Sequence, residues 1–114
     1  MSKRIQVGPN RWIGESEEPY VIAEIGINHN GSIDLCKKMI DQAVRVGVDA
    51  VKMQKRTIEE MYTKDALDVP YDKPYAFGKT YGEHKYALEF TDEQYFELQK
   101  YTHDQDCEFL VSGF

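Results

Sequence analysis

The spacing of apolar positions along the chain predicts three buried strands. Residues 20–25, 48–53 and 108–112 are short, mostly apolar runs, and Gly26 closes the first of them. Short runs of this kind, with turn residues at their ends, are typical of strands that are covered on both faces. We therefore expect these three segments to form the centre of the fold.

The first of two predicted helices covers residues 33–46, between the first and second strands. Its apolar residues recur at three- and four-residue spacing, which places them on one face of a helix. They are Leu35, Cys36, Met39, Ile40, Ala43 and Val46. Ser32 is a favourable N-cap, and Gly47 is typical of a helix C-terminus.

The second predicted helix begins with the clearest boundary signal in the chain. Thr91 and Gln94 have the spacing of a capping box, and Phe90 and Tyr95 occupy the two positions of a hydrophobic staple around it. We expect this helix to end at about Asp104. The preceding residues 55–90 have no sustained periodicity, so we expect a long loop there, and loops of this length are usually functional.

The order of elements indicates an α/β fold of the parallel type. Strand, helix, strand, loop, helix, strand is a βαβαβ order, which implies parallel strands with right-handed crossovers. Two helices cover only one face of three strands, so the other face needs further helices or the closure of a barrel. A (β/α)8 TIM barrel takes about 250 residues, so we interpret the chain as the N-terminal portion of one.

Residues 1–114 are accordingly expected to form one partial domain. Residues 1–19 contain two short alternating segments around the turn Gly8-Pro9-Asn10, which predict an N-terminal hairpin and lead-in. Residues 20–114 then provide the βαβαβ unit with its long loop at 55–90.

Charge and composition exclude several classes of function. The net charge is −6 and no basic stripe is present, which argues against nucleic acid as the main partner. We find neither the apolar segment of a signal peptide nor a run of about 20 apolar residues that could cross a membrane. Cys36 and Cys107 are unclustered, as expected for free thiols of a cytoplasmic protein.

Polar residues gather on one face of the predicted strands, near their carboxyl ends. Side chains alternate along a strand, so Glu24, then Lys52 and Gln54, then Ser112 share the face opposite the most apolar positions. Barrel active sites form at this end of the strands. A plain ion pair between Glu24 and Lys52 is the structural alternative, but four polar groups at one end of a core favour a site.

Four segments carry a resemblance to a known family. Residues 22–31 (IAEIGINHNG), 47–54 (GVDAVKMQ), 81–90 (YGEHKYALEF) and 109–114 (FLVSGF) are similar, in order and spacing, to the sialic acid synthases. These enzymes join phosphoenolpyruvate to N-acetylmannosamine or its 6-phosphate. Legionaminate and pseudaminate synthases are related alternatives with a different acylated aminosugar.

The resemblance implies roles for particular residues. Lys52 matches a lysine that contacts phosphoenolpyruvate, and Ser112 stands where the family has a small hydroxyl residue touching the same ligand. Glu24 matches a glutamate that hydrogen-bonds the sugar near its reacting carbonyl, with Gln54 beside it. Glu24 and Lys52 are thus the expected catalytic residues, and Tyr81 in the long loop is expected to face the sugar.

The resemblance also implies a cofactor and an assembly. A divalent cation, Mn2+ or Mg2+, would be bound by residues outside this chain, so His29, His84 and His103 are not expected to be its ligands. Full-length members of the family are homodimers. Two other functions remain open, namely a Schiff-base aldolase that uses Lys52 and a non-catalytic barrel fragment.

Overall fold

Three parallel strands form the centre of the molecule, as predicted. In a computed structural model that describes residues 3–114, β3 (Ile22–Gly26), β4 (Ala50–Lys55) and β5 (Glu108–Gly113) form one sheet in the order β3-β4-β5. Both pairings are parallel. Each strand therefore pairs with the next one along the chain, which is the order found in a barrel wall.

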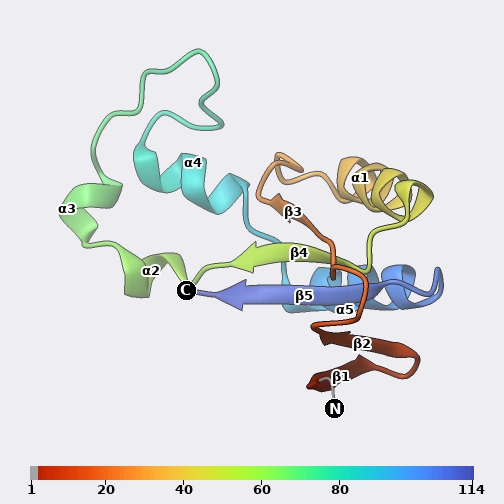
Figure 1. The fold of residues 1–114 in the computed structure, drawn as a ribbon. Helices are drawn as coiled ribbons and strands as arrows, with labels where there is room; N and C mark the ends of the chain where they lie inside the picture. Colours follow the sequence, from red (N-terminus) through yellow and green to blue (C-terminus); the bar gives the residue numbers. More distant parts are fainter. Residues whose placement is uncertain (1–2) are drawn as a thin grey trace.

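Two helices cover one face of this sheet (Figure 1). The helix α1 (Ile33–Val46) is capped by Ser32, and α5 (Asp92–His103) begins with the predicted capping box at Thr91 and Gln94. The predicted staple is also present, because the rings of Phe90 and Tyr95 lie 5.9 Å apart. Local signals at these helix ends were therefore sufficient to predict both elements.

The hydrophobic core lies between these helices and the sheet. Its buried members include Ile25 from β3, Val51 and Met53 from β4, and Ile40 and Leu98 from the two helices. Both cysteines are free, as predicted, and both are buried. Burial raises the pKa of the Cys36 thiol to about 12, so this thiol is unreactive near neutral pH.

The opposite face of the sheet is largely uncovered. On that face Ile22 is 43% exposed and Leu110 is 36% exposed. The radius of gyration is 17.1 Å, whereas a compact domain of this length has about 13 Å. The molecule is thus extended and has an apolar sheet face without a covering layer.

The segment expected to be a loop without regular structure contains three short helices, which corrects the prediction of two helices to five. They are α2 (Ile58–Met61), α3 (Lys64–Leu67) and α4 (Tyr81–Ala87). Helices of one or two turns are too short to produce a visible periodicity. Only α4 has a strong local signal, a capping box between Thr80 and Glu83. The three helices lie beyond the carboxyl ends of β4 and β5 (Figure 1).

The predicted hairpin is confirmed, and one arginine attaches it to the amino ends of the strands. Strands β1 (Arg4–Gly8) and β2 (Arg11–Gly14) pair antiparallel. Arg11 Nε donates to Asp49 Oδ1 over 2.8 Å, and Asp49 Oδ2 accepts from the Val21 N–H over 2.7 Å. The hydrogen bond from Arg11 lowers the pKa of Asp49. The hairpin therefore lies at the end of the sheet opposite to the polar residues.

Candidate active site at the carboxyl ends of the strands

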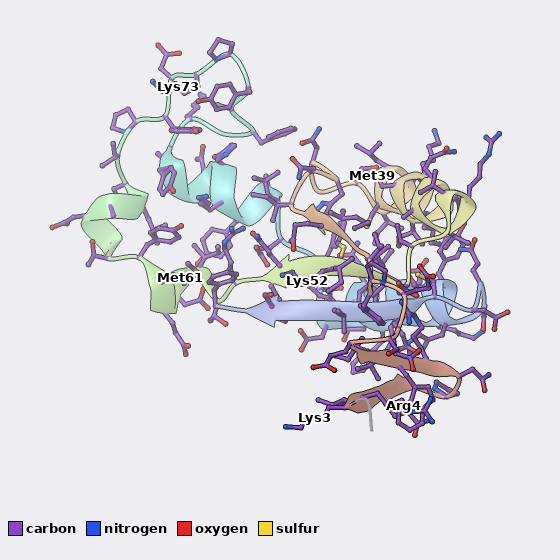
Figure 2. All side chains as sticks on the ribbon, viewed as in Figure 1. Lys3, Arg4, Met39, Lys52, Met61 and Lys73 are labelled. Carbon is purple, nitrogen blue, oxygen red and sulfur yellow. The ribbon has the colours of Figure 1, made fainter. Side chains whose placement is uncertain are left out.

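Glu24 and Lys52 are adjacent, as the side-chain alternation predicted. They are paired in the register of β3 and β4, and Lys52 Nζ lies 3.0 Å from Glu24 Oε2. Figure 2 labels Lys52 on β4, the central strand. The side chain of Lys52 remains 36% exposed and that of Glu24 remains 44% exposed. An ion pair this exposed stabilises a protein by at most about 1 kcal/mol, so a ligand can displace it at little cost.

Gln54 and Ser112 occupy the next row toward the carboxyl ends, where they are register partners. The backbone of this row is fixed from the helix side, because Tyr95 Oη donates to the Gln54 carbonyl over 2.9 Å. Glu24, Lys52, Gln54 and Ser112 therefore come together in two neighbouring rows of one sheet face. The predicted constellation is present as a geometric arrangement.

Gly26 lies beside the side chains of both Glu24 and Gln54. The pairing of β3 with β4 shifts between Glu24 and Gly26, and Gly26 has a φ of +60°, a left-handed conformation that favours glycine. A Cβ at this position would lie 3.5 Å from Glu24 Oε1 and 3.7 Å from Gln54 Cδ. These are ordinary van der Waals distances, so the left-handed backbone conformation, rather than a lack of space, is what favours glycine here.

Two functional candidates were not predicted from the sequence, namely Arg56 and Glu89. Arg56 Nη2 donates to Gln54 Oε1 over 2.6 Å, and the Arg56 N–H donates to Glu89 Oε2 over 3.1 Å. Burial raises the pKa of Glu89. In the sequence, Arg56 follows Lys52 and Gln54 at the same two-residue spacing, just after the end of β4. This spacing could have identified Arg56 as a candidate. Glu89 lies 33 residues away in sequence, and no local signal marks it.

Tyr81 does not join these four residues. It lies in the first turn of α4, where its ring meets Tyr62 and Tyr71 edge-on, with centroids 5.4 Å apart in each case. Lys85 Nζ lies 5.0 Å from the Tyr81 centroid. The helix itself is at the carboxyl end of the strands, on the side where the sugar was predicted, and the contact between Tyr81 and the sugar stays a prediction.

The three histidines differ in their surroundings. His103 is exposed at the end of α5. His84, expected in a loop, is buried in α4, where its Nδ1 accepts from the Phe77 N–H over 3.1 Å. His29 is fully buried in the loop after β3 and stacks on Phe90 at 4.0 Å. Its Nδ1 accepts from the Gly31 N–H over 2.9 Å, so the proton of the neutral ring is on Nε2.

His29 predicts a pH dependence of stability. Burial lowers its pKa from 6.5 to about 4, so the unfolded chain binds a proton more readily between these values. The neutral His29 ring makes its full contribution to the free energy of unfolding above about pH 6.5. This contribution is lost as the pH falls toward 4, and the free energy of unfolding then decreases by roughly 3 kcal/mol in total. We expect the free energy of unfolding of the full-length protein that contains these residues to fall as the pH is lowered from 7 to 4. The fall should be smaller in the His29→Phe variant than in the unmodified protein. Equal slopes for the two proteins would contradict this expectation.

The described residues were also compared with the ligand sets that hold metal ions. Within residues 3–114, no three His, Cys, Asp or Glu side chains lie close enough together to hold a metal ion. The site geometry therefore consists of one ammonium, one guanidinium, two carboxylates, an amide and a hydroxyl. Such a set can bind an anion and orient a polyhydroxylated ligand beside it.

In residues 3–114, no helix has the length and apolar content that crossing a bilayer requires.

Comparisons with known proteins support the resemblance seen in the sequence. A model of the NeuB family matches residues 39–114. The chain is 42% identical to the human N-acetylneuraminate-9-phosphate synthase over 99% of its own length, and covers 32% of that protein. It is 33% identical to the N,N'-diacetyllegionaminic acid synthase of Legionella pneumophila over 95% of its length, and again covers 32% of that protein.

A solved structure supports the fold. The N-acetylneuraminic acid (sialic acid) synthetase of Leptospira borgpetersenii serovar Hardjo-bovis, crystallised with citrate, matches with a TM-score of 0.77 and 26% identity. The match covers 100% of this chain and 35% of that one. The chain therefore spans about a third of the length of the relatives it matches, and its fold is that of the N-terminal portion of a (β/α)8 barrel.

Proposed function

The chain belongs to the NeuB family, and from this we propose that it is part of a synthase that condenses phosphoenolpyruvate with an N-acylated aminosugar. The acceptor would be N-acetylmannosamine, its 6-phosphate or a related acylated aminosugar. The products would be a nine-carbon 2-keto acid and phosphate. Among the relatives, the human and mouse proteins are named N-acetylneuraminate-9-phosphate synthases, which favours a phosphorylated product for this chain as well.

The observation that carries this proposal is the exposed pair of Lys52 and Glu24 at the carboxyl ends of the strands, 3.0 Å apart. An ammonium is a compact charge that suits the carboxylate or phosphate of phosphoenolpyruvate. When that anion binds Lys52, Glu24 loses its partner and is free to accept a hydrogen bond from a sugar hydroxyl. Ser112 would donate to the phosphoenolpyruvate, and Gln54 would bind the sugar beside Glu24.

The proposed reaction balances without a redox step. A carbon–carbon bond forms between carbon 3 of phosphoenolpyruvate and the aldehyde carbon of the open-chain sugar. Water adds at carbon 2, and phosphate leaves with cleavage of the carbon–oxygen bond. The Mn2+ or Mg2+ implied for the family would act as a Lewis acid. It would be bound by residues outside 1–114, and the roles given to Lys52 and Glu24 do not depend on it.

The test uses the full-length protein that contains residues 1–114, incubated with phosphoenolpyruvate and each candidate sugar. Release of phosphate together with a nine-carbon keto acid, detected by mass spectrometry, would support the proposal. Treatment with pyruvate and borohydride would trap a covalent adduct only if Lys52 formed a Schiff base, as in an aldolase. Absence of both reactions would favour the non-catalytic alternative.

We also propose that the enzyme is cytoplasmic and that the full chain is a homodimer. Two buried free thiols support the cytoplasmic location, because cytosolic proteins keep their cysteines reduced. The uncovered apolar face of the sheet supports assembly with further protein, whether from the same chain or from a partner. Size-exclusion chromatography with light scattering measures the mass of the assembly directly.

A further inference from the structure

One end of the side-chain amide of Gln54 is bound by Arg56. Arg56 Nη2 donates to Gln54 Oε1 over 2.6 Å. A guanidinium has only donors, whereas an amide has an oxygen that accepts hydrogen bonds and a nitrogen that donates them. The atom of Gln54 that faces Arg56 must therefore be the oxygen, and the amide nitrogen is directed away from the arginine.

The nitrogen end of this amide lies beside Gly26, as does one oxygen of Glu24. The position that a Cβ would have at Gly26 is 3.7 Å from Gln54 Nε2 and 3.5 Å from Glu24 Oε1. Lys52 approaches the other carboxylate oxygen, Glu24 Oε2, at 3.0 Å. One hydrogen-bond donor and one acceptor are therefore presented together at this point of the candidate site.

A hydroxyl group suits this combination, because a hydroxyl both donates and accepts hydrogen bonds. Placed between the two side chains, it can donate its proton to the Glu24 carboxylate and accept from the amide N–H of Gln54. If the amide were reversed, the hydroxyl would meet two acceptors, and its single proton could satisfy only one of them. An acceptor left without a partner costs free energy, so the orientation of the Gln54 amide affects how well a hydroxyl binds.

Arg56 is itself held by its neighbours, although it follows the last residue of β4. The Arg56 N–H donates to Glu89 Oε2 over 3.1 Å. On either side of Arg56, the Lys55 carbonyl accepts from the Phe114 N–H over 2.9 Å. The Thr57 N–H donates to the Phe114 carbonyl over 3.3 Å. The Arg56 Cζ also lies 5.4 Å from the ring centroid of Phe114, within the range of a cation–π contact. Both the backbone and the guanidinium of Arg56 are therefore held beside Gln54.

We propose that Arg56 is a positioning residue, which sets the orientation of the Gln54 amide so that its NH2 group faces the sugar beside Glu24. In this role Arg56 does not touch the sugar and acts only through Gln54. The inference rests on the proposed function, because it assumes that Gln54 and Glu24 bind a hydroxyl of the acylated aminosugar. It explains how an amide that could face either way provides one defined donor at this site.

The test is a double-mutant cycle in the full-length protein that contains residues 1–114. Its main readout is the KM for the aminosugar, N-acetylmannosamine or its 6-phosphate. Arg56→Ala is made alone and in a Gln54→Ala background. With Gln54 present, we expect Arg56→Ala to raise this KM roughly 3- to 10-fold, as for the loss of one hydrogen bond. In the Gln54→Ala background, the same substitution should have little effect.

Two controls accompany the cycle. The KM for phosphoenolpyruvate should change little in Arg56→Ala, because the proposed role concerns only the sugar. Arg45→Ala removes an exposed arginine in the last turn of α1 and should match the unmodified protein in both KM values.

Gln54→Glu gives a separate measurement that leaves Arg56 unchanged. The new carboxylate can still accept from Arg56 but has no NH2 group, so the KM for the sugar should rise at least as much as in Gln54→Ala. Arg56→Lys keeps a side chain that only donates hydrogen bonds. A KM for the sugar closer to that of the unmodified protein in Arg56→Lys than in Arg56→Ala would support the proposal.

Several outcomes overturn the role of Arg56. An unchanged KM for the sugar in Arg56→Ala would show no role. Equal increases with and without Gln54, or a parallel increase in the KM for phosphoenolpyruvate, would show a general structural role. A Gln54→Glu protein with an unchanged KM for the sugar would show that the amide N–H is not used. If the unmodified protein formed no keto acid from any candidate sugar, the proposed function would fail, and this role would fail with it.

Discussion

Replacing Lys52 by alanine in the full chain is expected to reduce kcat/KM for phosphoenolpyruvate roughly 30- to 1000-fold, equivalent to about 2–4 kcal/mol. The reason is the position of the ammonium, which lies on the uncovered face of the central strand and is held only by the exposed carboxylate of Glu24, 3.0 Å away. Removing it leaves no cation in that row of the sheet for the bound anion. Steady-state kinetics with varied phosphoenolpyruvate and saturating sugar measures the effect.

Three variants separate charge from packing. Lys52→Met keeps most of the volume and should lose as much activity as Lys52→Ala, whereas Lys52→Arg keeps a positive charge and should retain part of it. Lys55→Ala is the matched control, because Lys55 is the adjacent lysine on the same strand and pairs with Asp92 on the helix side. Unchanged kinetics in Lys52→Ala would show that the pair with Glu24 is only structural.

The elements that the sequence predicted well are those with strong local signals. Helix α1 has a regular apolar face between Ser32 and Gly47, and Gly47 takes the left-handed conformation (φ of 88°) that ends the helix. The capping box and staple at the start of α5 depend on residues within five positions of each other. Such signals need no knowledge of the tertiary structure, so they can be identified in the sequence alone.

The elements that the sequence did not predict depend on contacts between distant residues. The short helix α2 buries only Ile58, so its formation depends on packing against the rest of the chain. The hydrogen bond from the Arg56 N–H to Glu89 joins the end of β4 to the segment that precedes α5. No periodicity within either segment indicates that the two meet.

Side-chain alternation was sufficient to predict that Glu24, Lys52, Gln54 and Ser112 share one face of the sheet, because the three parallel strands pair in the order of the sequence. The alternation of side chains along each strand is enough to place Glu24 and Lys52 on the same face of the sheet. The register shift at Gly26 does not follow from this alternation, because it requires the backbone conformation of β3 against β4. The position of Gly26 beside both Glu24 and Gln54 is therefore a result of the structure rather than of the sequence pattern.

The second large effect concerns residues 1–114 produced as an isolated chain, which we expect to be inactive and to self-associate. Ile22 and Leu110 are 43% and 36% exposed on the uncovered face of the sheet. Full burial of such a side chain contributes about 1.5–3 kcal/mol, against a typical net stability of about 5–15 kcal/mol. Strand β5 also ends the sheet with an open edge, and an open edge invites pairing with another chain.

Sedimentation velocity and a thermal melt of the isolated chain measure this behaviour. Leu110→Glu places a charge on the uncovered face and should reduce association, whereas Val46→Glu on α1, where Val46 is also exposed, should not. Addition of Mn2+ should not produce synthase activity, because the described residues form no metal site. A monodisperse monomer with a cooperative melt would contradict the expectation. It would mean that the face carrying Glu24 and Lys52 needs no covering layer, and that the site could be studied in the isolated chain.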